Sequence, residues 1–147
     1  MTAWARRNLA LATACILAFS LVMGGVYIFG QLKMPKLVVS GKTFTTERRT
    51  TVAERAQGLS GRKSLDEKQT MLFVFEDTSE RCFWMKDMQF SIDIAWLDQD
   101  KKIVAVEQNV SPDTYPENFC YRAQYVVEFK AGSLQKYSIS NGDIVIF

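Results

Sequence analysis

The chain has 147 residues, of which 48% are hydrophobic, and its 18 basic and 16 acidic residues give a net charge of +2. This length accommodates one compact domain and an anchor, but not two full domains. The sequence has no histidine, which excludes Ser–His and Cys–His nucleophile pairs and removes the commonest metal ligand. Because the charges are nearly balanced, we expect no nucleic-acid partner, and we also expect no metal and no cofactor.

The first long feature is an apolar run from Leu9 to Phe29 that contains no charged residue. A helix of this length rises by roughly 31 Å, which matches the hydrocarbon core of a bilayer. Arg6 and Arg7 precede the run, and Lys33 follows it. We predict a cytoplasmic tail, a single transmembrane helix and a short linker, at residues 1–8, 9–30 and 31–35.

Three alternatives to this anchor are open at the level of sequence. A cleaved signal peptide would need a shorter apolar region that ends in small residues. A lipoprotein anchor would use Cys15, but the apolar run continues well beyond this residue. A buried core helix would not confine its charges to the two ends of so long a run. The basic residues before the helix favour an N-terminus inside the cell, which places residues 36–147 outside the cytoplasm.

The remainder of the chain consists of short apolar runs separated by turn-forming residues. We predict strands at residues 36–40, 42–46, 50–53, 70–76, 82–86, 92–98, 103–107, 124–130 and 143–147. Short helical pieces are expected at residues 53–59, where Gly58 or Gly61 would end the helix, and at residues 133–138. This pattern is typical of a small domain that is mainly β, built as an antiparallel sandwich or a barrel, with one or two short helices.

The densest group of functional side chains lies between Cys82 and Asp93. Alternate residues of a strand point to the same face, so Cys82, Trp84 and Lys86 would share one face. An aromatic ring beside a cation and a carboxylate suits a sugar or a small anion. The competing interpretation places Trp84 in the core and pairs Lys86 with Asp93 or Asp87 at the surface, where such pairs contribute little.

Seven short motifs occur in a characteristic order along this region. They are Gly58-Leu59, Met71-Leu72-Phe73-Val74-Phe75, Phe83-Trp84-Met85-Lys86, Ile92-Asp93-Ile94, Tyr125-Val126-Val127-Glu128, Ala131-Gly132 and Gly142-Asp143. In this order they resemble the Domain of Unknown Function 192 family, and the resemblance covers residues 50–147. It implies a small β-rich domain of a kind that is often exported or tethered to membranes, and it implies no particular activity.

Cys82 and Cys120 are the two cysteines that lie outside the apolar run. In an oxidising compartment, an even pair of cysteines most simply forms a disulfide, which here would stabilise the fold by roughly 4 kcal/mol. The alternative is a pair of buried free thiols. A redox role is not expected, because the spacing is far from Cys-x-x-Cys.

Carboxylates are the remaining candidates for chemistry. Asp87, Asp93 and Glu128 could divide acid and base roles if their environments differ, or they could be charges at turns and strand edges. Asp98 and Asp100 flank one residue as in some calcium loops, but the other ligands are missing, so a solvated hairpin tip is expected.

Taken together, these features favour a membrane-tethered, extracytoplasmic domain that binds a ligand, such as a carbohydrate, or a protein partner in the cell envelope. The alternatives are a carboxylate-based envelope hydrolase and a structural subunit of a membrane complex. An enzyme is the less favoured reading, because no catalytic motif is recognised. The candidate ligand-binding residues are Trp84, Lys86, Asp87, Asp93 and Glu128.

Overall fold

The computed structural model describes residues 34–147. The predicted transmembrane helix at residues 9–30 lies outside the described residues, as do the predicted tail and most of the linker. Within the described part of the chain, no helix combines the length and the apolar character that crossing a bilayer requires.

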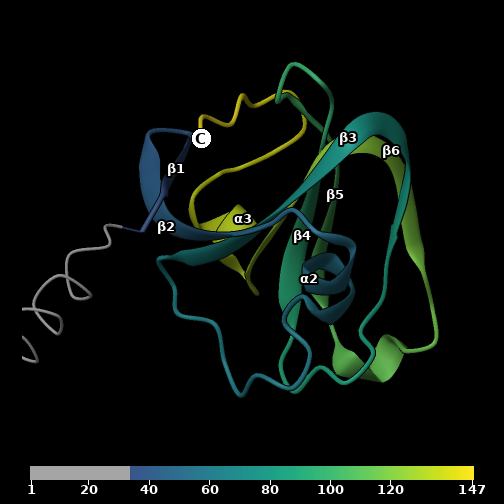
Figure 1. Ribbon diagram of the computed structural model, residues 1–147. Coiled ribbons are helices and arrows are strands. Elements are labelled where there is room, and N and C mark those ends of the chain that lie inside the picture. Colours follow the sequence, from purple (N-terminus) through teal and green to yellow (C-terminus); the bar gives the residue numbers. More distant parts are fainter. Residues whose placement is uncertain (1–33) are drawn as a thin grey trace, which may run out of the picture. The chain divides into compact units, whose positions relative to one another are not determined.

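A single mixed sheet, in the strand order β1-β2-β3-β6-β4-β5, forms the body of the domain (Figure 1). Its strands are β1 (Lys36–Val39), β2 (Lys42–Arg49), β3 (Gln69–Phe83), β4 (Ile92–Leu97), β5 (Ile103–Val110) and β6 (Phe119–Lys130). β2 and β3 pair in parallel, and the other neighbours are antiparallel. The prediction of a mainly β domain is confirmed. The predicted antiparallel sandwich or closed barrel is wrong, because the strands form one sheet with a parallel pair.

The parallel pair requires a crossover between β2 and β3, and helix α2 (Val52–Gln57) begins this crossover. The Thr51 side chain accepts a hydrogen bond from the Glu54 backbone N–H, while the Glu54 carboxylate accepts one from the Thr51 backbone N–H. This capping box starts the helix where we expected a strand at residues 50–53. Gly58 ends the helix as predicted, with a φ of 49°.

β3 is one strand of 15 residues, where the sequence predicted two strands at residues 70–76 and 82–86. Its register with β6 shifts between Val74 and Ser79, and Figure 1 shows the two strands bending together. The residues between Val74 and Ser79 therefore form a bulge within one strand, and they do not form a loop between two strands. Beyond the bend, β6 continues to pair with β3 but not with β4.

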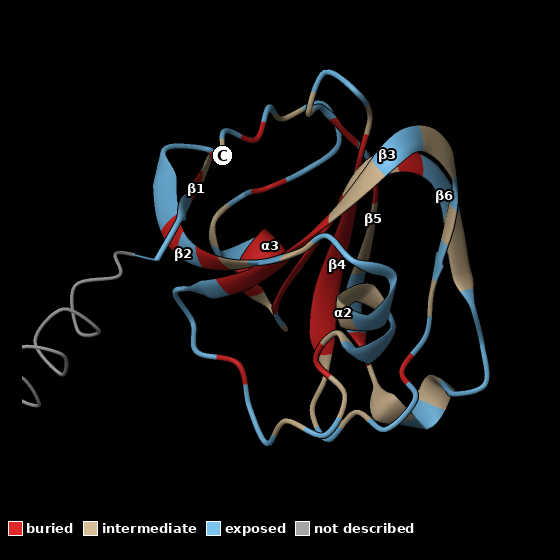
Figure 2. Cartoon of the chain, viewed as in Figure 1, coloured by how far each residue is buried: buried red, intermediate tan, exposed pale blue. Residues whose placement is uncertain are grey.

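Apolar side chains cover both faces of the sheet, so β4 is buried along its whole length (Figure 2). On one face, helix α3 (Ser133–Lys136) places Leu134 in a cluster with Leu72, Leu97 and Phe129. The crossover covers the opposite face, where its residues Leu59 and Leu65 pack against Phe73, Ile94, Trp96 and Val126. Glu128 alternates with Phe129 along β6 and therefore lies on the crossover face.

Asp93 is the charged residue of β4, and it is fully buried on the α3 face. Its carboxylate accepts backbone N–H groups from Asn109 at 2.8 Å, Gly132 at 3.1 Å and Leu134 at 2.9 Å. These donors belong to the end of β5 and to the turn that starts α3. One carboxylate thus ties β4 to two other segments, which is a structural role.

The predictions for the hairpin tip after β4 and for the last strand have different outcomes. The hairpin tip after β4 is confirmed, because the Asp98 carboxylate accepts the backbone N–H groups of Asp100 and Lys102. The strand predicted at residues 143–147 is reduced to two isolated bridges, Val38 with Ile146 and Lys102 with Ile144. The C-terminal segment thereby contacts both edges of the sheet without a continuous ladder.

We predict that Asp93→Ala lowers the free energy of unfolding by about 3 kcal/mol or more, because three buried N–H groups lose their acceptor. Asp93→Asn keeps one acceptor oxygen and should lose less. Urea unfolding of the full chain in detergent, followed by near-UV circular dichroism, measures both. Asp100→Ala, at the exposed hairpin tip, is the control. A loss for Asp93→Ala no larger than for this control would refute the structural role.

Candidate functional site

A pocket of about 190 Å³ lies where α2 and the turn after it meet β3 and β6. Its walls are mostly apolar and include Leu59, Phe73, Phe75, Phe83 and Met88. The rings of Phe73 and Phe83 pack edge to face, with centroids 4.8 Å apart. The pocket is therefore bounded by side chains that pack against one another and form part of the core.

Gly58 allows the crossover to approach the sheet closely at this pocket. A Cβ atom at this position would lie 3.3 Å from Cζ of Phe73, and the backbone φ of 49° also favours glycine. The next residue, Leu59, is 2% exposed and anchors the turn in the core. The Gly58-Leu59 motif is thus explained by the packing of the pocket wall.

The Phe83-Trp84-Met85-Lys86 motif continues the alternation of β3 beyond its last residue. Met85 is buried, whereas the Trp84 side chain is 51% exposed and Lys86 is exposed. The Ser60 hydroxyl donates to the Lys86 carbonyl oxygen at 2.9 Å, which fastens this segment to the turn after α2. The predicted sharing of one face by Trp84 and Lys86 is therefore consistent with their exposure.

Trp84 also borders a second, more open groove of about 320 Å³, together with Lys86, Tyr115, Pro116 and Asn118. The Tyr115 side chain is 50% exposed. Lys86 takes part in none of the ion pairs found within residues 34–147. Sequence reasoning missed Tyr115 and Asn118, which lie in the loop between the strands predicted at residues 103–107 and 124–130.

The disulfide between Cys82 and Cys120 positions this loop, and it confirms the predicted pair. The two residues face each other in the ladder of β3 and β6, with Cα atoms 4.1 Å apart. Cys82 lies two residues before Trp84, and Cys120 follows the loop that carries Tyr115. The covalent link therefore joins the strand that leads to Trp84 to the strand that follows the Tyr115 loop.

Glu128 lies in the pocket and is only 6% exposed. Its Oε2 atom is buried and has no hydrogen-bond partner among residues 34–147. Burial raises the pKa of Glu128 to about 8, and the charges of Arg49 and Arg62 oppose this shift only in part. At neutral pH the side chain is therefore mostly a neutral carboxylic acid, which can donate a hydrogen bond.

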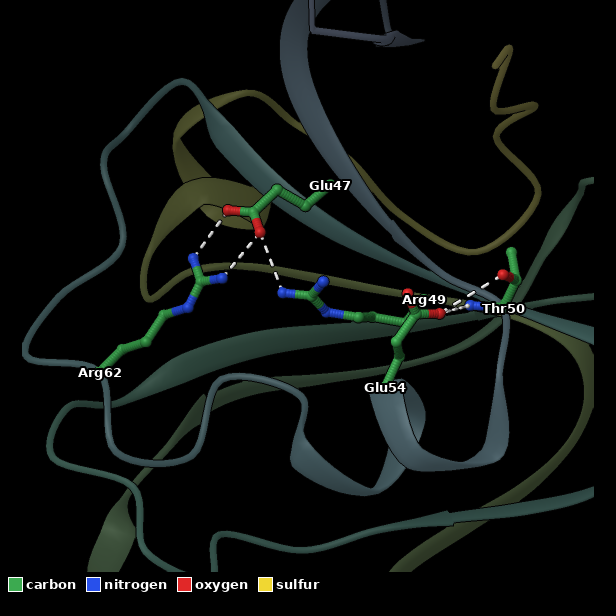
Figure 3. A network of polar contacts seen from close by, with 5 residues as sticks. All are labelled: Glu47, Arg49, Thr50, Glu54 and Arg62. Atoms are coloured by element: carbon green, nitrogen blue, oxygen red, sulfur yellow. Dashed lines mark hydrogen bonds and ion pairs between the residues drawn. The ribbon is translucent and has the colours of Figure 1, made fainter.

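Arg49 and Arg62 do not neutralise Glu128, because both pair with Glu47 (Figure 3). Arg62 binds both carboxylate oxygens of Glu47 at 2.7 Å, and Arg49 binds one of them at 2.9 Å. The hydrogen bonds from Arg62 are the main reason that the pKa of Glu47 is lowered. Glu47 therefore carries the negative charge of this cluster.

The structure brings together some of the predicted site residues and separates others. Trp84 and Glu128 line the pocket, and Trp84 and Lys86 line the groove. Asp93 lies on the opposite face of the sheet, and Asp87 is exposed at a turn with a φ of 58°. The three candidate carboxylates do not converge, and no ion pair between Lys86 and either aspartate occurs in the described residues. The same residues contain no cluster suited to a metal ion.

Comparison with known proteins identifies the family. The family model of the Domain of Unknown Function 192, described as an uncharacterized ACR, matches residues 36–147. The chain belongs to this family. No curated protein matches the chain. The resemblance to this family that the sequence motifs indicated is thus confirmed. The predicted membrane anchor lies outside the matched residues.

Two solved structures are similar to this member of the Domain of Unknown Function 192 family. A protein of unknown function from Novosphingobium aromaticivorans has 25% identity and a TM-score of 0.72, over 76% of this chain and 84% of that chain. A protein from Sinorhizobium meliloti, described as a "putative transcription regulator", has 26% identity and a TM-score of 0.71, over 79% of this chain and 96% of that chain.

We predict that the stability of Glu128→Gln depends less on pH than that of the parent chain. The folded-state pKa of Glu128 is about 8, against an ordinary value of 4.5. The contribution of this side chain to the stability of the parent chain is therefore fully present below pH 4.5 and is lost as the pH rises toward 8. Glutamine does not ionise. The free energy of unfolding of the variant minus that of the parent should therefore increase by roughly 3 kcal/mol from acidic to neutral pH.

Urea unfolding of both chains in the same detergent, at pH values below and above the ordinary glutamate pKa, measures this difference. Other ionisable groups are common to the two proteins, so the comparison isolates Glu128. A difference that stays constant with pH would show that Glu128 ionises normally in the folded chain.

Proposed function

We propose that residues 34–147 form a ligand-binding domain, which an N-terminal membrane anchor holds on the outer side of the cell membrane. The observation that carries the proposal is the position of Trp84. Its half-exposed indole borders two hollows, the pocket and the groove. A large aromatic side chain at the edge of a concave site is a common element of small-molecule recognition.

The chemistry of the groove favours a saccharide as its ligand. Trp84 and Tyr115 line the groove and supply aromatic rings, which can pack against the apolar face of a sugar ring. Lys86 supplies hydrogen-bond donors without a competing ion pair among the described residues. The side-chain amide of Asn118 donates an N–H to the Pro116 carbonyl oxygen at 3.2 Å, which leaves the side-chain oxygen of Asn118 as an acceptor. Sugar hydroxyls, which both donate and accept, match this set.

An envelope hydrolase is less well supported. Glycoside hydrolysis by carboxylates needs two of them on either side of the scissile bond. Among the described residues, Glu128 is the only carboxylate that lines the pocket, and Asp93 is occupied with three backbone N–H groups. Binding without turnover therefore accounts better for the arrangement.

We predict that neutral or acidic oligosaccharides bind at the groove and that Trp84→Ala and Tyr115→Ala each weaken this binding roughly tenfold or more, because the ring loses a stacking surface. Lys86→Ala should weaken the binding of uronic-acid oligosaccharides more than that of neutral ones. An oligosaccharide array probed with the full chain, followed by calorimetry on the hits, measures these effects. Ile146→Ala, which removes an exposed apolar side chain outside the groove, is the control.

Failure of all oligosaccharides to bind, or equal binding by the parent chain and both aromatic variants, would contradict the saccharide assignment.

For the tether, we predict that protease added to intact cells degrades residues 36–147 of the full chain, because the anchor places them outside the cytoplasm. An immunoblot with an epitope at the C-terminus measures the loss, and a cytoplasmic protein that stays intact in the same cells is the control. Protection of the C-terminal epitope until the cells are lysed would place the domain in the cytoplasm.

A further inference from the structure

Glu128 Oε2 is one of four buried side-chain atoms that lack a hydrogen-bond partner within residues 34–147. The other three belong to Thr46, Arg49 and Arg81, and none of these residues lines the pocket. Most buried polar atoms in folded proteins have a partner, and a missing one costs roughly 1–3 kcal/mol. Glu128 lines an open pocket, so a molecule that enters the pocket can approach the carboxyl group of this residue.

The charged residues around Glu128 make their hydrogen bonds to other groups, although Nε of Arg49 has no partner among residues 34–147. On β2, Glu47 binds Arg49 and also Arg62, which follows α2. On α2, Arg55 donates to the carbonyl oxygens of Thr50 and Val74. No guanidinium in the described residues therefore hydrogen-bonds to the Glu128 carboxyl group.

The strands beside Glu128 contribute only apolar neighbours. Its cross-strand partners are Met71 on β3 and Ile94 on β4, and both are buried. Arg55 stacks on Phe75, with its guanidinium carbon 4.8 Å from the ring centroid, at the wall of the same pocket. A ligand in the pocket would thus meet walls that are mostly apolar, the Glu128 carboxyl group and, at the rim formed by α2 and the turn after it, the polar residues Arg55, Gln57 and Ser60.

We propose that the pocket binds a small, uncharged, mostly apolar molecule with one hydrogen-bond acceptor, such as an aryl ketone, and that the Glu128 carboxyl group donates a hydrogen bond to this acceptor. The volume of about 190 Å³ is below the roughly 300–1,000 Å³ of sites for drug-sized molecules, so it suits a single ring or a short acyl chain. This site goes beyond the saccharide groove, because it lies in a different hollow beside Trp84.

The raised pKa of Glu128, about 8, supports the donor role, since the proton is present at neutral pH. An ionised ligand is disfavoured, because its charge would have to leave water for walls that are mostly apolar. A ligand without an acceptor would fill the pocket but leave the carboxyl group unpaired. The acceptor therefore distinguishes the intended ligand class from other molecules of the same shape.

Two fluorinated probes of matched shape test this proposal. They are 4-fluoroacetophenone and 4-fluoro-α-methylstyrene, in which a methylene group replaces the carbonyl oxygen. Both are titrated into the full chain in detergent, and the indole N–H signal of Trp84, assigned with Trp84→Phe, reports the binding by NMR. For each probe, the affinity of the parent chain is divided by that of Glu128→Leu, which cancels partitioning into the detergent.

We expect this ratio to be roughly tenfold higher for the ketone than for the alkene near neutral pH. Glu128→Gln keeps an N–H donor, so it should retain the preference for the ketone. The parent chain should lose the preference as the pH rises above about 8, and the glutamine variant should not. This second comparison remains informative if Glu128→Leu does not fold.

Equal ratios for the two probes, or no response of the Trp84 signal to either probe, would overturn the proposal. Likewise, a ketone preference that persists in the parent chain at high pH would overturn the donor role of Glu128. Lys86→Ala, which alters only the groove, should leave probe binding unchanged. Saccharide binding in the groove is tested with the Lys86 and Tyr115 variants, and binding in the pocket is tested with the Glu128 variants. The result for one proposal therefore does not decide the other.

Discussion

The shared pairing of Glu47 with Arg49 and Arg62 determines the character of the candidate site. A buried carboxylate needs a counter-ion or several donors, and otherwise it retains its proton. Glu47 binds both arginines and is itself ionised, so the positive charges nearest to Glu128 are already compensated in part. Among the described residues, Oε2 of Glu128 has no hydrogen-bond partner, and the neutral acid is the form that a mostly apolar pocket tolerates.

The sheet places two buried carboxyl groups on opposite faces, and they have opposite environments. Asp93 on β4 faces α3 and accepts three backbone N–H groups, so its bonding capacity is used within the fold. Glu128 on β6 faces the crossover, where apolar side chains surround it. This contrast explains why we assign a structural role to Asp93 and propose ligand contact for Glu128.

Local patterns in the sequence predicted the features that depend on neighbouring residues. The alternation from Cys82 to Lys86, the end of α2 at Gly58 and the hairpin tip at Asp98 follow from short-range rules. The cysteine pair was predicted from the even number of cysteines outside the apolar run. The burial of Glu128 was not predicted, because the strand Gln124–Lys130 alone gives no indication that a distant crossover covers its polar face.

The same limit applies to the sheet and to the groove. The parallel pairing of β2 with β3 and the bulge in β3 depend on contacts between segments that are far apart in the chain. Asp93 was interpreted as a surface residue, because its three donors lie 16 to 41 residues away. Tyr115 and Asn118 reach Trp84 only through the fold of their loop, which the disulfide fastens to β3.

The proposed role of the pocket depends on the protonation state of Glu128, and the titration of this side chain is its most direct test. In the full chain labelled with carbon-13, the carboxyl signal of Glu128 can be assigned by its loss in Glu128→Gln and followed with pH. The account predicts a midpoint near pH 8, with the acid form present at neutral pH. A midpoint at or below the ordinary glutamate value of 4.5 would contradict it.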